Sequence, residues 1–289
     1  DKIGKIDIIV GGPPCQGFSL KGQRKGLNDE RNFLFKEFKK YVEYFRPTYF
    51  LIENVPTILT EQGGFFKDQI IKVFEKIGYK INVGILKASD FGVPQNRKRA
   101  IFLGSLNKKI NFPKPNSKKI VTVWEAISDL AYLNSGEGSF ESKYKYDPKS
   151  DYQKKLREKS LKLYNHVATK HAPIAIERLK LIPPEKGKEF IIDKYNITST
   201  FGQTWGRLEK NKPSPTIVTR FDTPSNGRNS HPFLHRAITP REAARIQSFP
   251  DSFIFYGNKS SIIKQIGNAV PPLLGQAIAM QILKHHKQI

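Results

Sequence analysis

The chain has 289 residues, of which 49 are Lys or Arg and 26 are Asp or Glu, so its formal net charge is +23. This charge favours a phosphate-rich partner such as nucleic acid, and the hydrophobic content of 38% is enough for a substantial core. The single cysteine excludes an internal disulfide and a cysteine-based zinc cluster, and the sequence, without a long apolar run or a signal-peptide pattern, predicts a cytoplasmic protein that contacts no membrane.

The first predicted element is a strand at residues 6–10, and the glycine- and proline-rich segment after it contains the only cysteine, Cys15. Pro13 and Pro14 cannot donate ladder hydrogen bonds, so they end the strand and place the cysteine on a rigid turn. A lone cysteine is often only a buried packing residue. This one follows the carboxyl end of a strand, where open α/β sheets bind ligands, and its position favours a nucleophile.

A helix is predicted near residues 33–45, where apolar side chains recur on one face, and a strand follows at residues 49–55. The aromatic and β-branched start of that strand indicates a buried parallel strand, and Glu53 lies near its end. A glutamate in this place could also cap a helix or pair with a cation. Because two consecutive strands end in Cys15 and Glu53, we expect these side chains to share the mouth of an active site.

A helix near residues 65–77 and strands near residues 80–86 and 100–104 complete the predicted α/β array. The basic segment Gln95-Asn96-Arg97-Lys98-Arg99 directly precedes the last of these strands. Basic runs usually form a solvated face. This one leads into a buried strand, and it is therefore the third candidate element of a site.

The stretch from about residue 105 to 235 has an irregular apolar pattern and many prolines, with short helices predicted near residues 122–130 and 151–164. His166 and His171 are close in sequence and resemble a pair of metal ligands. No cysteine or acidic residue follows at a suitable ligand spacing. We therefore interpret both histidines as structural residues or as residues that face nucleic acid, and we expect no metal site.

The last stretch contains two ordered features. Thr239-Pro240-Arg241-Glu242 has the pattern of a helix start, with Thr as N-cap, Pro at the first helical position and Glu at the third. The segment Gly267-Asn268-Ala269-Val270-Pro271-Pro272 leads into an apolar helix predicted at residues 273–283. The chain thus returns to regular structure after its irregular middle part.

Five segments of the chain stand in one order: Pro13-Pro14-Cys15-Gln16, Glu53-Asn54-Val55, Gln95 to Arg99, Arg236 to Glu242 with Gln247 to Asp251, and Gly267 to Pro272. In this order they resemble the later motif blocks of the cytosine-5 DNA methyltransferases, in particular the bacterial restriction-modification enzymes. The resemblance extends from about residue 5 to residue 280. It implies an α/β fold with the Rossmann-like sheet of S-adenosylmethionine-dependent methyltransferases, incomplete at the N-terminus, and a smaller target-recognition domain.

The resemblance implies a catalytic role for five residues. The Cys15 thiolate would add to carbon 6 of cytosine, so that carbon 5 becomes nucleophilic and accepts a methyl group from S-adenosylmethionine. Glu53 would protonate or hydrogen-bond the ring nitrogen N3, and Arg99 would hold the O2 atom. Arg97 would support the site or contact a phosphate. Asn54 would order the loop around the glutamate.

The resemblance also implies that the target base is flipped out of the DNA duplex, because stacked neighbours block attack on the ring. The segment at residues 19–26 directly follows the nucleophile and combines glycines with basic side chains. We expect it to close over the DNA and to hold phosphates. The residues predicted to contact DNA in this segment are Ser19, Lys21, Gln23 and Arg24.

By position, residues 1–104 would form the catalytic domain, residues 105–235 the target-recognition domain, and residues 236–289 a return to the catalytic domain. The segments Gly206-Arg207-Leu208 and Pro215 to Arg220 resemble the closing part of the target-recognition domain. We expect Arg207, Thr216 and Arg220 to contact double-stranded DNA, because sequence is recognised at base edges.

The cofactor implied by the resemblance is S-adenosylmethionine. The matching residues that would contact it are Pro14, Leu34, Asn268, Ala269 and Val270. The family's glycine-rich Phe-x-Gly-x-Gly loop and its ribose-binding acidic residue should precede the strand that leads to the cysteine, and no Phe-x-Gly-x-Gly occurs in this sequence. We therefore expect an N-terminal cofactor-binding segment to be supplied in cis or as a separate chain.

Two alternatives to a DNA methyltransferase of a restriction-modification system, acting on nucleoid DNA in a prokaryotic cytoplasm, stay open. A tRNA cytosine-5 methyltransferase would use the same chemistry, but the target-recognition region is large and the Cys-Phe-Thr element of that branch is incompatible with Cys15 as the only cysteine. A non-catalytic DNA-binding or specificity subunit could retain the motifs. The intact set of Cys15, Glu53 and Arg99 disfavours that second alternative.

Overall fold

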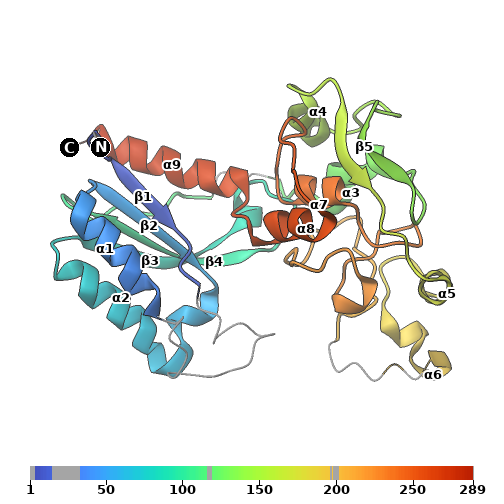
Figure 1. Ribbon diagram of the computed structural model, residues 1–289, viewed down its shortest axis with the longest axis horizontal. Coiled ribbons are helices and arrows are strands. Elements are labelled where there is room, and N and C mark those ends of the chain that lie inside the picture. Colours follow the sequence, from blue (N-terminus) through green and yellow to red (C-terminus); the bar gives the residue numbers. More distant parts are fainter. Residues whose placement is uncertain (1–3, 15–32, 116–118, 196, 198–201, 289) are drawn as a thin grey trace. The chain divides into compact units, whose positions relative to one another are not determined.

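The computed structural model describes residues 4–14, 33–115, 119–195, 197 and 202–288 (Figure 1). The chain divides into two compact units. Unit 1 comprises Asp1–Lys87, Lys98–Lys114 and Ala277–Ile289, and unit 2 comprises Ala88–Arg97 and Pro115–Gln276. Residues 236–276 belong to the same compact unit as the middle of the chain, while the functional division into three segments stays a prediction.

Unit 1 contains a four-stranded sheet in the order β1-β2-β4-β3. Its strands are β1 (Ile8–Gly11), β2 (Tyr49–Asn54), β3 (Lys80–Lys87) and β4 (Lys98–Ser105). β1 and β2 are parallel, whereas β4 is antiparallel to both β2 and β3. The expected α/β array is therefore confirmed, and the carboxyl ends of β1 and β2 lie at the same edge of the sheet.

Two helices cover one face of this sheet, α1 (Phe35–Phe45) and α2 (Phe65–Glu75), as Figure 1 shows. Buried side chains recur every four residues along α2, at Phe66, Ile70 and Phe74, and this period places them on one stripe. They pack on Phe50 and Ile52 of β2 in a single apolar cluster. The predicted helices near 33–45 and 65–77 are thus confirmed with slightly shorter bounds.

The opposite face of the sheet is contacted by the end of α9 (Pro272–His286), which confirms the helix predicted at residues 273–283. Side chains alternate along a strand, so Tyr49 points away from its neighbour Phe50. The hydroxyl of Tyr49 lies 3.1 Å from Nδ1 of His286. Within the described part of the chain, no single helix is long and apolar enough to cross a membrane, and only the bent pair of α8 (Lys259–Asn268) and α9, taken together, reaches that length and composition.

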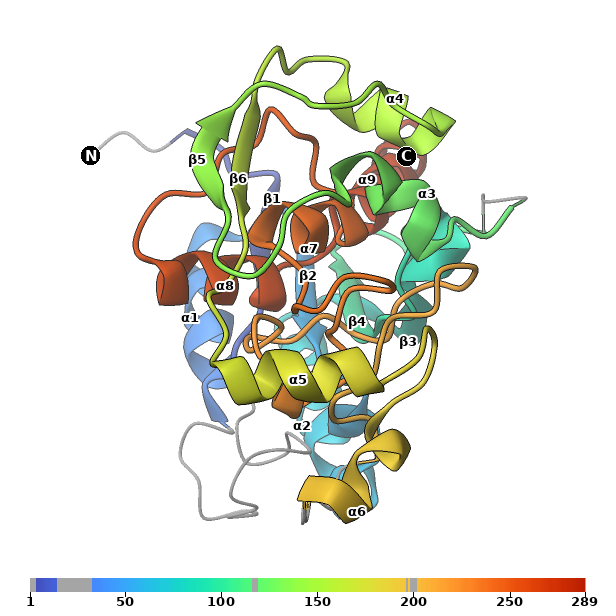
Figure 2. The ribbon, with the colours of Figure 1, turned by 90° about the vertical axis from the view of Figure 1, so that its right-hand side faces the viewer.

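Unit 2 contains short elements around an apolar core that includes Ile127, Phe221 and Ile246, and Figure 2 shows its antiparallel strands β5 and β6 side by side. The strands are β5 (Gly138–Ser142) and β6 (Leu163–Val167). The helices are α3 (Val123–Ile127), α4 (Asp151–Arg157), α5 (Pro173–Leu181), α6 (Ile192–Tyr195), α7 (Pro240–Ile246) and α8 (Lys259–Asn268). Turns of 3₁₀ helix lie at Ala88–Phe91, Ser128–Leu130, Lys188–Phe190 and Pro224–Asn226 in unit 2, and at Pro56–Leu59 and Glu61–Gly64 in unit 1.

One predicted helix is wrong in its extent. The helix expected near residues 151–164 ends at Arg157, and the end of the expected range belongs instead to β6, which starts at Leu163 and pairs with β5. The helix start at Thr239 is confirmed. Its Oγ1 accepts a hydrogen bond from the backbone N–H of Glu242 at 3.1 Å, and the Glu242 carboxylate accepts one from the backbone N–H of Thr239 at 2.8 Å.

Candidate active site

The predicted catalytic glutamate and arginine form an ion pair at one edge of the unit 1 sheet. Glu53 lies opposite Ile101 in the antiparallel register of β2 and β4, and Arg99 lies two residues from Ile101 on the same face. The Arg99 Nε atom is 2.7 Å from Glu53 Oε1, and the two side chains are 12% and 16% exposed. The sheet therefore presents a carboxylate and a guanidinium together, with a small part of each open to a ligand.

Asn54 fixes the chain that leads to the cysteine. Its Nδ2 atom donates a 2.9 Å hydrogen bond to the carbonyl oxygen of Pro13, and its Oδ1 accepts one of 2.8 Å from the backbone N–H of Val55. A side chain at Gly12 would begin 3.6 Å from Oε2 of Glu53, so the end of β1 passes close to this carboxylate. Cys15 follows two residues after Pro13 and lies outside the described residues.

The ion pair also determines the electrostatics of this edge. Burial lowers the pKa of Arg99, while the charge of Glu53 and the bond to it act in the opposite direction. Arg99 Nη1 also donates to the carbonyl oxygen of Lys98 at 2.8 Å, which fixes the plane of the guanidinium. A fixed guanidinium beside a carboxyl group can bind a planar ring that offers an oxygen acceptor next to a ring nitrogen.

Arg97 belongs to unit 2 and is only 2% exposed. Its Nη1 atom donates to the carbonyl oxygen of Ile217 at 3.0 Å, and its Nη2 donates to that of Gly267 at 3.1 Å. The sequence left two roles open for this residue, support of the site or contact with a phosphate. The burial and the two backbone contacts favour the supporting role.

The residues expected to contact the cofactor are divided between the two units. In unit 1, Pro14 is exposed after β1 and Leu34 is half-buried directly before α1. In unit 2, Asn268 is the exposed last residue of α8, and Ala269 and Val270 after it are half-buried. Each group has surface available to a ligand, and their shared role stays a prediction.

The expected DNA contact of Arg207 does not fit the structure. This residue is 1% exposed, and burial lowers its pKa to about 10. Its guanidinium donates at 2.6–2.9 Å to the carbonyl oxygens of Leu179, Ile182, His231 and Leu234. Sequence indicates a cation but not its burial, and here the cation joins α5 to the segment before α7.

The other residues expected to contact DNA have different positions. Arg220 is exposed and Thr216 is half-buried, so both offer surface to a partner. The predicted contacts in the segment after the nucleophile lie outside the described residues; they are Ser19, Lys21, Gln23 and Arg24.

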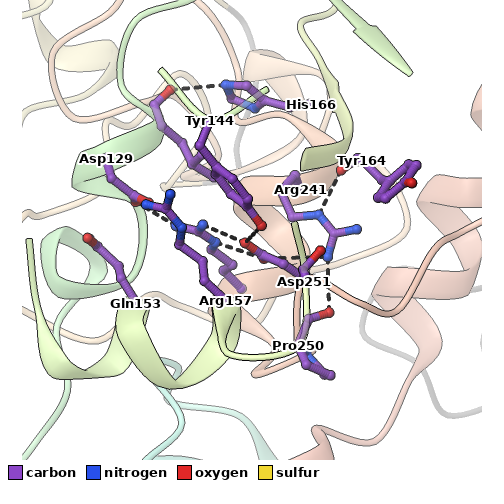
Figure 3. Close-up of polar contacts among 12 residues, drawn as sticks. Asp129, Tyr144, Gln153, Arg157, Tyr164, His166, Arg241, Pro250 and Asp251 are labelled. Atoms are coloured by element: carbon purple, nitrogen blue, oxygen red, sulfur yellow. Dashed lines mark hydrogen bonds and ion pairs between the residues drawn. The ribbon is translucent and has the colours of Figure 1, made fainter. Parts of the chain in front are cut away.

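A buried ionic network around α7 was not foreseen from the sequence (Figure 3). Arg245 lies between two aspartates, with 2.5 Å to Asp129 and 2.6 Å to Asp251, and all three side chains are fully buried. Tyr144 donates to Asp251 at 2.9 Å, and Arg157 lies 3.3 Å from Asp129. A signal was present, because the small residues Ala243 and Ala244 beside the charges are typical of a helix enclosed on all sides.

A second buried ion pair lies at the N-terminus of α7. Arg236 Nη1 and Nη2 each lie 2.7 Å from one carboxylate oxygen of Glu242. Burial alone would raise the pKa of Glu242, but the charge of Arg236 and its hydrogen bonds lower it to about 2. Arg241 donates to the backbone carbonyl oxygens of Tyr164 and Pro250, as Figure 3 also shows. The block between Arg236 and Asp251 is therefore an interior scaffold of unit 2.

His166 and His171 both have structural partners. The ring nitrogens of His166 lie 3.0 Å from Thr239 Oγ1 and 3.1 Å from the carbonyl oxygen of Leu130. His171 Nε2 accepts a 3.1 Å hydrogen bond from the backbone N–H of Ala237. Across the described ranges, no three His, Cys, Asp or Glu side chains gather in an arrangement that could hold a metal ion.

Comparison with known proteins matches residues 1–284 to the family described as C-5 cytosine-specific DNA methylase. The Type II methyltransferase M.DdeI of Desulfomicrobium norvegicum is 39% identical over 99% of this chain and 75% of its own length. M1.HphI of Haemophilus parahaemolyticus is 36% identical over 97% of this chain and 69% of its own length.

A solved structure supports the same fold. A candidate DNA modification methyltransferase encoded within an E. coli prophage superposes with a TM-score of 0.75 at 29% identity, covering 97% of this chain and 79% of that one. The fold expected from the sequence, that of the S-adenosylmethionine-dependent methyltransferases, is confirmed. The chain belongs to the family of C-5 cytosine-specific DNA methylases and is a DNA (cytosine-5)-methyltransferase.

Proposed function

We propose that this chain methylates carbon 5 of a flipped-out cytosine within a specific sequence of double-stranded DNA, through a covalent adduct with Cys15. The observation that supports the proposal most strongly is the Glu53–Arg99 pair, 2.7 Å apart, beside the Pro13 carbonyl that Asn54 holds. This edge of the sheet leads directly into the cysteine. The edge therefore places an acid, Glu53, and a cationic donor, Arg99, beside the segment that precedes the nucleophile.

The chemistry follows from the electron demand of the ring. The Cys15 thiolate forms a bond to carbon 6, and the electron pair of the 5,6 double bond moves toward carbon 5. Glu53 donates a proton or a hydrogen bond to N3, and Arg99 holds O2, so that the charge developing on the ring is neutralised. Bound S-adenosylmethionine would supply an electrophilic methyl group to carbon 5, with its methyl–sulfur bond broken and S-adenosylhomocysteine as the leaving group. Loss of the carbon 5 proton then expels the thiolate and restores the aromatic ring.

The proposed cofactor is S-adenosylmethionine, and the described residues fit only part of its site. Pro14 after β1 and Leu34 before α1 each offer apolar surface that suits an adenine ring, and Asn268 offers an exposed amide. A carboxylate to hold the ribose and the glycine-rich loop would come from the N-terminal segment.

We also propose that this N-terminal segment, in cis or as a separate chain, covers β1. Within the described sheet β1 is an edge strand, and its Val10 and Ile8 side chains are 63% and 37% exposed. An apolar edge strand with unpaired backbone groups promotes aggregation. Calorimetry with S-adenosylmethionine tests this, because residues 1–289 alone are expected not to bind it measurably, while addition of the segment restores binding. Tight binding by residues 1–289 alone would contradict it.

We place the enzyme in a bacterial restriction-modification system that acts on nucleoid DNA in the cytoplasm, since the similar proteins named above are Type II methyltransferases. The test is bisulfite sequencing of DNA and tRNA from cells that express the intact polypeptide or its Cys15→Ala variant. Methylation at one DNA sequence, absent in the variant, is the expected result. Methylated tRNA with unmodified DNA would favour the tRNA alternative, and no methylation of either would favour a non-catalytic specificity subunit.

A further inference from the structure

Three segments that are distant in sequence meet at one buried place in unit 2, which we call the junction. They are residues 95–97, residues 217–219, and the end of α8 at Ile266 and Gly267. Gln95 and Arg97 are 0% and 2% exposed. The contacts of the junction therefore form in the interior, where an unsatisfied polar group is costly and the geometry is closely fixed.

Arg97 joins two of these segments through its guanidinium. One nitrogen donates to the carbonyl oxygen of Ile217 and the other donates to that of Gly267, at 3.0 and 3.1 Å. The carbonyl of Gly267 lies in the last turn of α8, where backbone oxygens lack helical partners and a cation is favourable. The planar guanidinium thus sets the separation of two backbone segments.

Gln95 and Gln247 form a second connection beside it. Gln95 Oε1 accepts from the backbone N–H of Ile217 at 2.8 Å, and its Nε2 donates to Gln247 Oε1 at 2.8 Å. Gln247 Nε2 then donates to the carbonyl oxygen of Ile266 at 2.7 Å. Backbone bonds between Pro94, Asn96 and Ser214 extend the same alignment. Residues 217 and 266–267 are therefore connected twice, once through each side-chain path.

The backbones also touch directly. A Cβ atom at Gly267 would lie 2.7 Å from the nitrogen of Thr219 and 2.7 Å from the carbonyl carbon of Val218. Real Cβ atoms do not approach backbone atoms this closely, so any side chain at this position would push the two segments apart. The junction therefore depends on the absence of a side chain at Gly267.

We propose that the junction couples DNA binding to cofactor binding, with Arg97, Gln95 and Gly267 as positioning residues. The segment at 217–219 lies between Thr216 and Arg220, and Gly267 directly precedes Asn268. This inference rests on the proposed function, in which those flanking residues contact DNA and cofactor. If DNA bound beside residues 217–219 favours one arrangement of the junction, the cofactor binds more tightly beside Gly267. The cofactor then raises the affinity for DNA by the same factor.

The test measures one ratio in the intact polypeptide, the affinity for its target duplex with S-adenosylhomocysteine divided by the affinity without it. Gly267→Ala should bring this ratio close to one, whereas the protein without substitutions should show a ratio of about 5–150, as is typical of coupled sites. The affinity for S-adenosylhomocysteine with and without DNA should change by the same factor. Gly275→Ala is the matched control, because a Cβ there meets nothing within 4 Å, and it should retain the ratio.

A second pair of variants separates coupling from stability. Arg97→Met should lower the ratio, and Arg97→Lys, which offers a single ammonium in place of two nitrogens, should give an intermediate value. Arg207→Met removes another buried arginine of unit 2 that contacts backbone carbonyls, but none of the junction. It should lower the melting temperature and leave the ratio unchanged.

Two results would overturn the proposal: a ratio of one in the protein without substitutions, or an unchanged ratio in Gly267→Ala and Arg97→Met. If unfolding rather than decoupling explains the losses, Arg207→Met will lower the ratio as much as Arg97→Met does, and the proposal is then wrong. Failure of the proposed function is a different outcome. In that case the intact polypeptide methylates no DNA, whatever its ratio.

Discussion

Units 1 and 2 both contain a buried apolar cluster, but their interiors differ in the charge that they hold. The core of unit 1 is aromatic and apolar, with Phe50 and Phe74 in contact at a ring separation of 4.3 Å. The centre of unit 2 contains fully buried charges, among them Arg245 between Asp129 and Asp251. An apolar core tolerates exchanges that conserve volume, whereas a buried charge needs its own partner. The two units should therefore respond differently to substitutions of similar size.

The largest effect is expected for Arg245→Met, which keeps much of the side-chain volume but leaves Asp129 and Asp251 without their shared cation. Removal of one partner of a buried ion pair costs about 3–5 kcal/mol of the free energy of unfolding. Denaturant unfolding of the purified protein measures this loss. A loss below about 1 kcal/mol, the range of exposed pairs, would show that the network is not a stabilising centre of unit 2.

The next effect concerns pH and should also be confined to unit 2. Burial lowers the pKa of His166 to about 4 and that of His231 to about 3 in the folded protein. Between these values and the ordinary value of 6.5, the unfolded chain binds more protons, so the free energy of unfolding falls as the pH falls. For the two histidines together, the loss between pH 7.5 and 5.5 is about 2–3 kcal/mol.

Glu242 acts in the same direction at lower pH. Its lowered folded pKa, about 2, contributes stability that is complete above its unfolded pKa and is lost as the pH falls toward 2.

Hydrogen exchange at pH 7.5 and 5.5 tests the effect of the two histidines in each unit separately. Amides of α7 should lose protection at the lower pH, while those of β2 and β4 should retain it. Equal loss of protection in both units would contradict the comparison.

A smaller effect is expected for Phe74→Leu in unit 1. The swap removes part of a ring from a cluster that other aromatic side chains surround, and cores adjust to such apolar exchanges at a cost of about 1.5 kcal/mol or less. Thermal unfolding should show a modest decrease in melting temperature and no change in its pH dependence. A loss as large as that of Arg245→Met would mean that the aromatic core is as intolerant as the ionic one.

The smallest effect is expected for Glu43→Gln on the surface of α1. The Lys39–Glu43 pair is as short as the Arg245–Asp129 pair, 2.5 Å, but its side chains are 25% and 50% exposed. Solvent screens this pair, so its removal should change the free energy of unfolding by about 0.5 kcal/mol or less. Because the two distances are equal, a difference between the two losses of unfolding free energy measures the effect of burial alone. Comparable losses for both pairs would refute that interpretation.

The comparison also explains which structural features the sequence predicts. Apolar periodicity indicates the helices and strands of unit 1, because the residues that repeat are those that pack together. It also places Glu53 and the turn after β1 at one edge of the sheet, since parallel strands end on the same side. The capping box at Thr239 is equally local, as its two partners are three residues apart.

The features that the sequence does not reveal depend on distant partners. Asp129 and Arg245 are 116 residues apart in the sequence. Arg207 donates to backbone carbonyl oxygens, and no sequence pattern predicts such partners. α4 is shorter than expected, and the end of its expected range belongs to β6, whose pairing with β5 is a tertiary contact rather than a local preference. Sequence therefore identifies chemical groups well, but whether an arginine faces solvent, a substrate or the interior depends on the fold.

We propose that Cys15 attacks cytosine at the edge of the sheet where Glu53 and Arg99 form their pair. The most direct measurement uses target DNA with 5-fluorocytosine at the methylated position, incubated with S-adenosylmethionine and the intact polypeptide. Fluorine at carbon 5 blocks the final proton loss, so the enzyme should remain covalently attached to the DNA. Mass spectrometry should locate this attachment on Cys15, and Cys15→Ala should give no covalent complex while it still binds the duplex. A covalent complex or methylated product with Cys15→Ala would contradict the account.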